Sequence, residues 1–104
     1  MAYYLVTAEP MQLEDLRRRL DSGEIAALRP FGTSMHASLL GARRTPHGRA
    51  IWEEECYCSP PLKQERQVLD QYFRGLTTEQ VDRGSGWAQI DDLPSLWQTG
   101  EEPL

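Results

Sequence analysis

The stretch AYYLVTAEPMQLEDLRRRLDSG, residues 2–23, decides how the fold begins. Residues 2–8 are rich in β-branched and aromatic side chains, a composition that favours a strand. Residues 11–22 predict a helix, because three leucines recur at helical spacing on one face: Leu13, Leu16 and Leu20. A strand followed directly by an amphipathic helix indicates a domain that mixes both kinds of structure.

The middle of the chain is harder to assign. Residues 25–33 indicate a short strand or an extended loop, because Pro30 and Gly32 interrupt any regular element. Residues 34–58 resemble a β-hairpin around the turn cluster TPHG at 45–48. The downstream arm has clear strand character. The upstream arm, residues 34–43, fits either a strand or a helix, and we favour the strand.

The second half completes the element order. Residues 60–75 predict a second helix, with Ser59 and Pro60 at its start and Gly75 at its end. Residues 79–90 predict a last strand, interrupted by glycines. The resulting order is that of an α+β, ferredoxin-like βαββαβ sandwich, with two helices on one face of an antiparallel sheet. The uncovered sheet face then suggests a homodimer.

Composition restricts the possible classes of protein. A chain of 104 residues is the length of one domain, so we expect a single α+β domain over residues 1–97 and a disordered acidic tail over 98–104. The net charge of −5 argues against a nucleic-acid partner. We find no targeting signal and no apolar stretch of the roughly 20 residues that a membrane helix needs. We therefore expect no membrane association and a cytoplasmic protein.

Cys56 and Cys58 are the only cysteines, and they stand one residue apart. On a strand, such residues point to the same face, so two thiolates could bind a soft metal with His36 as a third ligand. The hairpin register, however, places His36 opposite Tyr57, on the other face. Two small buried side chains are the simpler interpretation, since free cysteines usually behave as hydrophobic residues.

The run Glu53-Glu54-Glu55 offers a second candidate. Alternation along a strand puts Glu54 on the face of Trp52 and the cysteines. A desolvated carboxylate there would have a raised pKa and could act as a general base, with His36 and Arg29 completing a catalytic set. The simpler interpretation is an exposed or ion-paired glutamate on an edge strand.

Three tryptophans form the third candidate: Trp52, Trp87 and Trp97. They either complete the core or make a surface for a ligand or partner, where tryptophan is enriched. The sequence identifies no function. The preferred hypothesis is a small non-catalytic binding or accessory domain that recognises a protein or a small ligand, without a cofactor. The alternatives are a small enzyme of the dimeric α+β barrel type and a metal-binding protein.

Overall fold

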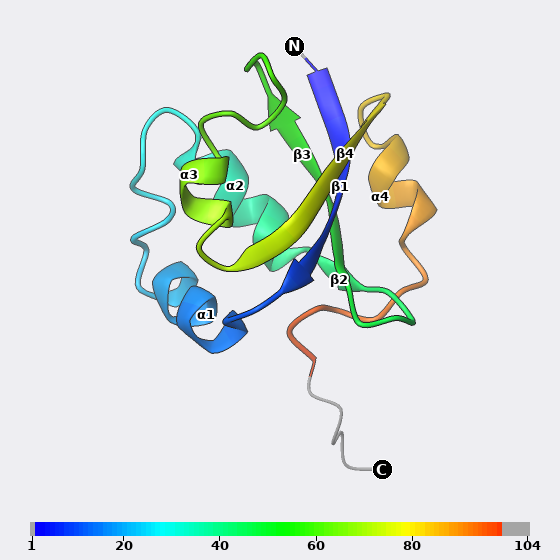
Figure 1. Cartoon of the computed structure of the whole chain (residues 1–104), viewed down its shortest axis with the longest axis horizontal. Coiled ribbons are helices and arrows are strands. Elements are labelled where there is room, and N and C mark those ends of the chain that lie inside the picture. The colour runs from blue at the N-terminus through cyan, green and yellow to red at the C-terminus, as the bar shows by residue number, and fades with distance from the viewer. Residues whose placement is uncertain (1, 99–104) are drawn as a thin grey trace.

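The computed structural model describes residues 2–98 and consists of one antiparallel sheet with surrounding helices (Figure 1). The strands follow the order β2-β3-β1-β4. Their bounds are β1 Ala2–Pro10, β2 Arg43–Arg44, β3 Ala50–Cys56 and β4 Phe73–Val81. The helices are α1 Leu13–Asp21, α2 Gly32–Leu40, α3 Arg66–Leu69 and α4 Ser85–Gln89. The prediction of a small α+β domain with an antiparallel sheet is confirmed.

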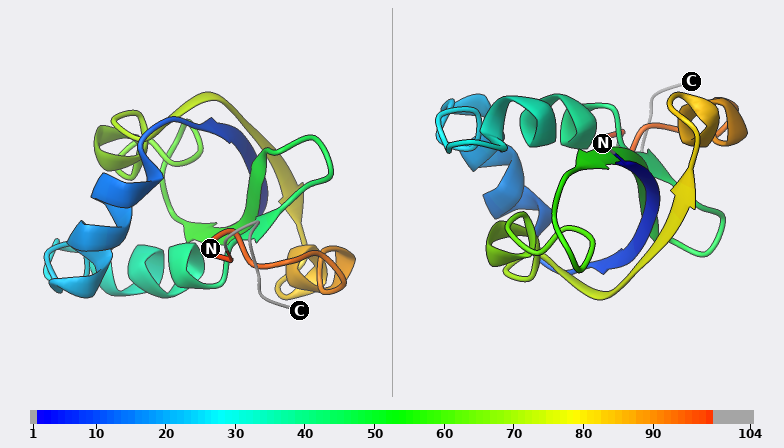
Figure 2. Two further views of the ribbon diagram at one scale, coloured as in Figure 1. Left: turned by 90° about the horizontal axis from the view of Figure 1, so that it is seen from below. Right: turned by 90° about the horizontal axis from the view of Figure 1, so that it is seen from above.

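The strand β1 forms the centre of the sheet because it pairs with both long neighbours. Val6 lies opposite Trp52 of β3 on one side and opposite Thr78 of β4 on the other. The strands curl, so that the sheet has a concave and a convex side (Figure 2). The register places alternate residues of β1 and β3 on each side, which gives the two faces different chemistry.

The concave side holds the main core. Val6 and Trp52 are fully buried there, and the Trp52 ring packs on Phe73 with 5.1 Å between ring centroids. The helices α1, α2 and α3 lie on this side (Figure 2). The predicted stripe on α1 is confirmed in part, since Leu16 and Leu20 are buried.

The helix α4 and the segment after it cover part of the convex side. Leu5 and Glu53 lie on this face and contact Gly86 of α4. The following segment runs along β2, where the Leu96 N–H donates to the Ala42 carbonyl at 2.9 Å. We expected a homodimer because this face of the sheet would otherwise be uncovered. Since α4 covers part of the face, that argument for a homodimer is weaker.

The prediction of a strand over residues 34–43 is wrong, because these residues continue the helix α2 up to Leu40. Met35 and Leu39 are one helical turn apart and are both fully buried, which is the helical alternative left open by the sequence. Gly32 begins the helix at a close approach: a Cβ there would lie 2.4 Å from the Ile25 carbonyl oxygen. Residues 25–31 form turns instead of a strand.

The prediction of a helix over residues 60–75 is also wrong over most of its length. Only α3 is α-helical, and β4 already begins at Phe73. Gly75, expected at a helix end, lies inside β4 with a φ of 63°. The predicted strand over 79–90 ends at Val81, and α4 replaces its second half because Gly84 turns the chain with a φ of 81°.

Four helices therefore stand where two were expected, and they lie on both sides of the sheet. No helix among residues 2–98 is long and apolar enough to cross a membrane. Residues 99–104, which make up most of the expected tail, and Met1 lie outside the described residues.

Candidate functional site

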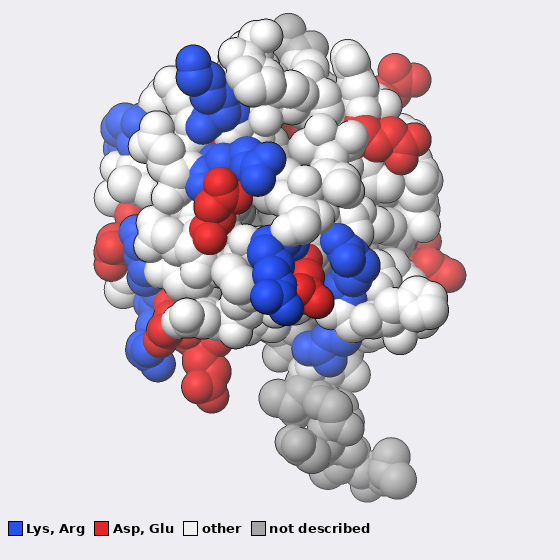
Figure 3. Space-filling model, in the orientation of Figure 1, with Lys and Arg blue, Asp and Glu red and all other residues white. Residues whose placement is uncertain are grey.

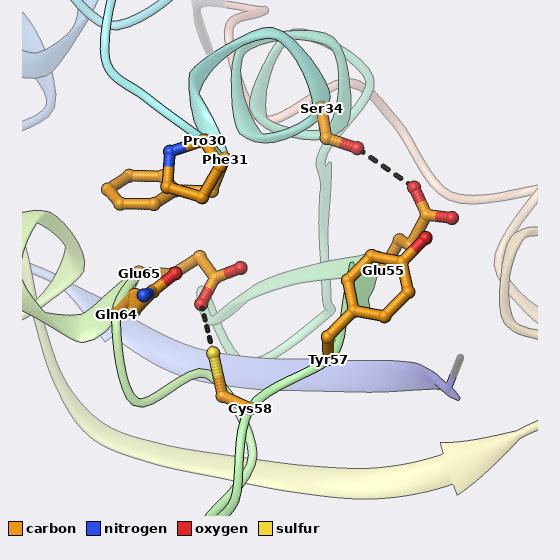
Figure 4. Close-up of a pocket in the computed structure, with 8 residues that line it drawn as sticks. All are labelled: Pro30, Phe31, Ser34, Glu55, Tyr57, Cys58, Gln64 and Glu65. Atoms are coloured by element: carbon orange, nitrogen blue, oxygen red, sulfur yellow. Dashed lines mark hydrogen bonds between the residues drawn. The ribbon is translucent and has the colours of Figure 1, made fainter.

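A pocket of about 410 Å³ opens at one end of the sheet, where β3 ends and the chain passes the beginning of α2. Figure 4 shows its lining residues. They come from the α2 start, the β3 end and the loop before α3: Pro30, Phe31, Ser34, Glu55, Tyr57, Cys58, Gln64 and Glu65. Segments far apart in the sequence thus meet around one space, as is usual for ligand sites.

Glu55 is held at both carboxylate oxygens by neutral donors. The Ser34 hydroxyl donates to Oε1 and the Tyr3 hydroxyl donates to Oε2, each at 3.2 Å. Desolvation and the hydrogen bond to Glu55 raise the pKa of Tyr3, so that Tyr3 remains a donor at neutral pH. The two hydroxyls fix the direction of the carboxylate, and neither of them carries a positive charge.

Two aromatic rings stand on opposite sides of the space, Phe31 beside Pro30 and Tyr57 beside Glu55 (Figure 4). Tyr57 is 75 % exposed. No lysine, arginine or histidine lines the pocket. Among the described residues, neither Glu55 nor Glu65 forms an ion pair. The pocket is therefore aromatic and negatively charged.

The third wall carries sulfur. The thiols of Cys56 and Cys58 both donate to Oε1 of Glu65, at 3.5 Å and 3.6 Å. Glu65 is only 3 % exposed, although it carries a carboxylate. Burial raises the pKa of the Cys56 thiol to about 11, so Cys56 on its own is a poor nucleophile.

The residues proposed for an enzyme do not line this pocket. Glu54 lies in the core at 0 % exposure, where Trp52 Nε1 donates to its Oε1 at 2.9 Å. Desolvation raises the pKa of Glu54 to about 8, so the interpretation favoured from the sequence, an exposed or ion-paired glutamate, is wrong. The Arg29 guanidinium is exposed and donates to backbone carbonyls of residues 26–28. His36 lies on α2, and its Nδ1 is buried without a hydrogen-bond partner.

The three tryptophans belong to the core or its edge. Trp52 is fully buried and so contributes no surface. Trp87 and Trp97 are partly buried against the core. Trp97 Nε1 donates to the Leu39 carbonyl at 2.8 Å, and the Arg17 guanidinium lies 5.4 Å from the Trp97 ring centre. These contacts fasten the C-terminal segment to α1 and α2.

Sequence reasoning missed most of the pocket. Cys58 was expected in a metal set, and both cysteines do reach one atom, but the third residue is Glu65 and His36 is not in the cluster. Phe31, Tyr57 and Glu65 were not singled out. The sequence placed Tyr57 and Cys58 inside the downstream strand of the hairpin, whereas β3 ends at Cys56 and both residues lie just after it, where functional loops often begin.

The chain has no significant match to any protein-family model, to any curated protein or to any solved structure. The site therefore has to be interpreted from its own geometry. Basic and acidic side chains lie interspersed over the face shown in Figure 3. Ion pairs such as Arg17–Asp21 connect some of the charged residues of the molecule.

Proposed function

We propose that the protein is a non-catalytic binding domain that takes a small organic cation, an amine or a quaternary ammonium group, in the pocket between Phe31 and Tyr57. The observation that carries this proposal is the carboxylate of Glu55. It is aimed by two hydroxyl donors and paired with no cation among residues 2–98.

The aromatic rings supply the second part of the recognition. A cation within about 6 Å of an aromatic ring centre is attracted by the ring face, most strongly where water is excluded. Phe31 and Tyr57 stand on either side of the space beside Glu55 (Figure 4). Carboxylate and rings together favour a positive group that carries apolar substituents over a bare inorganic cation.

The charge of the lining residues argues against an anionic ligand. A phosphate or a carboxylate ligand needs arginine, lysine or backbone N–H groups at its site. The lining has two carboxylates and no basic side chain. Arg83 acts on Tyr3 electrostatically, but it is not among the lining residues.

The test compares choline with its neutral isostere, in which carbon replaces the quaternary nitrogen. Calorimetric titration of the full chain should show that choline binds and that the isostere binds with an affinity lower by about tenfold or more. The reason is that only the cation is attracted by Glu55 and the aromatic rings. Glu55→Gln and Tyr57→Ala should each weaken choline binding by a similar factor, whereas Glu79→Gln, an exposed carboxylate on β4, should not.

Equal affinities for choline and its isostere would contradict the proposal that the pocket recognises a positive charge. Unchanged choline binding by Glu55→Gln would remove Glu55 from the site. Because choline is one member of the class, a primary amine such as ethanolamine is titrated in parallel. Absence of binding by both cations overturns the proposal.

We also propose that the fold is an elaborated ferredoxin-like arrangement. The order β2-β3-β1-β4 supports it, because β3 lies between β1 and β2 while β1 lies between β3 and β4. On this interpretation α1 and α2 share the first crossover, α3 makes the second, and α4 is an addition.

A homodimer remains part of the proposal, and β4 is the element that supports it. Among the described residues β4 pairs only with β1, so its outer edge offers unpaired backbone groups to a second copy. We also propose a cytoplasmic location. Both cysteines are free thiols, and thiols stay reduced in the cytosol.

A further inference from the structure

Two sulfur atoms and one carboxylate oxygen, all of which can bind metals, lie close together beside the pocket, at the end of β3. The Sγ atoms of Cys56 and Cys58 and a carboxylate oxygen of Glu65 all lie within 4.8 Å of one another. The two thiols reach the same oxygen, Oε1 of Glu65. Each of the three side chains offers one donor atom, so a single ion bound by all three could take the place of the two thiol protons.

The separations fit a tetrahedral ion. With a Zn–S bond of about 2.3 Å and a Zn–O bond of about 2.1 Å, a tetrahedral angle places sulfur and oxygen roughly 3.6 Å apart. The two sulfur–oxygen distances are 3.5 Å and 3.6 Å. Both sulfur–oxygen separations therefore match those of a tetrahedral site, and the two sulfur atoms lie within 4.8 Å of each other.

Two backbone N–H groups point at the sulfur atom of Cys56. The N–H of Cys58 donates to Cys56 Sγ at 3.0 Å and the N–H of Leu62 donates to it at 3.3 Å. Leu62 holds a φ of 63°, a conformation that costs a non-glycine residue free energy. The strained, fully buried Leu62 thus directs its N–H at sulfur, and such outer hydrogen bonds orient and tune metal ligands.

A pair of thiols hydrogen-bonded to a carboxylate is the simplest alternative, and burial argues against it. A carboxylate that is 3 % exposed needs strong compensation, while S–H groups are weak donors. A divalent cation would compensate all three groups at once. Thiolate sulfur also selects zinc-like ions over magnesium and calcium, which prefer oxygen ligands.

We propose that Cys56, Cys58 and Glu65 bind one zinc-class divalent cation, with its fourth coordination position directed at the pocket. Cys58 and Glu65 line the pocket, which leaves that position accessible to water or to a ligand atom. Binding releases the two thiol protons to solvent and involves no change of oxidation state. The inference goes beyond binding of an organic cation and does not depend on it, since that recognition is assigned to Glu55 and the rings.

Cobalt(II) is the probe, because its tetrahedral thiolate complexes absorb visibly and zinc displaces it. The untagged full chain, stripped with a chelator and kept reduced with a phosphine, should bind one equivalent of Co²⁺. A sulfur-to-metal charge-transfer band and tetrahedral d–d bands should appear, and Zn²⁺ should abolish them. Elemental analysis of protein purified without chelator should find one zinc per chain.

The variants assign the ligands. Glu65→Gln should weaken Co²⁺ binding by about tenfold or more, and Cys58→Ser should remove much of the charge-transfer intensity, because each loses one ligand. Asp70→Asn, which changes an exposed carboxylate directly after α3, is the matched control and should bind Co²⁺ as the parent does. Cys58 is only partly buried, so Cys58→Ser is the variant expected to stay folded, and circular dichroism checks this.

Absence of a charge-transfer band in the reduced parent protein overturns the proposal. So does a Co²⁺ affinity that Glu65→Gln and Cys58→Ser leave unchanged. Choline titration of the same proteins separates the two proposals. If the parent binds choline but no Co²⁺, only the metal site is contradicted. If the parent binds Co²⁺ and Glu55→Gln leaves choline binding unchanged, only the organic-cation assignment is contradicted.

Discussion

Three consecutive glutamates on β3 meet three different environments. Glu53 accepts backbone N–H groups of Gly84, Gly86 and Trp87 at distances of 2.8, 2.7 and 3.2 Å. Glu54 lies in the core with one oxygen bonded to Trp52 and the other without a hydrogen bond. Glu55 faces the pocket. Three neighbouring residues of one type therefore differ in their surroundings: Glu53 anchors α4, Glu54 is buried in the core, and Glu55 lines the pocket.

Glu54 should make stability depend on pH. Burial raises its pKa from 4.5 to about 8, with smaller contributions from the charges of Glu65 and Glu55. Between these values the unfolded chain releases a proton that the folded protein keeps, so the free energy of unfolding is highest at low pH in this window and falls as pH rises. We expect a fall of roughly 1 kcal/mol per pH unit in metal-free protein.

Urea unfolding between about pH 5 and pH 8, with a chelator present, measures this fall. Glu54→Gln keeps an acceptor for Trp52 and cannot ionise, so its profile should be flatter than that of the parent. Glu79→Gln, on exposed β4, serves as the control and should keep the parental slope. Parallel profiles for the parent and Glu54→Gln would contradict the shifted pKa.

At the scale of elements, α4 depends on one carboxylate. It has only five residues, too few to be stable alone, and Glu53 accepts hydrogen bonds at its beginning. Glu53→Ala should lower the free energy of unfolding by about 3 kcal/mol, because three buried or half-buried N–H groups lose a charged acceptor. Urea unfolding measures the loss, and Glu79→Ala should cost less than about 0.5 kcal/mol. A small loss for Glu53→Ala would show that α4 is held by apolar contacts instead.

Local patterns predicted the elements that have a distinctive composition or a regular apolar spacing. The strand β1 was recognised from its β-branched and aromatic residues, and the helix α1 was recognised from its leucine spacing. The helix α2 was mistaken for a strand because its apolar positions are few and its start is set by packing of Gly32 on the Ile25 carbonyl. The segment 60–75 has helical spacing, yet pairing of Phe73–Val81 with β1 overrides it.

The candidate site was only partly predictable for the same reason. Spacing alone places Cys56 and Cys58 on one side of the chain, and their sulfur atoms do meet at Glu65. Nothing local indicates that Glu65 folds back across the loop, or that the α2 start brings Phe31 and Ser34 to Glu55. Those contacts depend on the tertiary arrangement of three segments.

At the scale of the whole molecule, the two edges of the sheet differ. The C-terminal segment protects the β2 edge, where Arg43 bridges to Ser95 and the Arg44 N–H donates to the Pro94 carbonyl at 2.8 Å. The edge of β4 has no such cover among residues 2–98, and most of its side chains are exposed.

The free β4 edge predicts association of two copies, since unpaired strand edges readily add a strand. Native mass spectrometry of the untagged chain should show twice the monomer mass at micromolar concentration. Dilution should then expose amides of β4 to hydrogen exchange while β1 stays protected. A monomer at every concentration would contradict the dimer. A dimer in which dilution leaves the hydrogen exchange of β4 unchanged would show that the contact lies elsewhere.

The central position of β1 also has a consequence for synthesis. Translation proceeds at roughly 5 to 20 residues per second, and β1 precedes both of its partners, β3 and β4, along the chain. The outer partner β4 and the segment that closes the β2 edge are translated after β3. The apolar strand β1 is therefore unpaired until β3 has been made, so nascent chains that stall before Ala50 expose it and become substrates for chaperones or proteases.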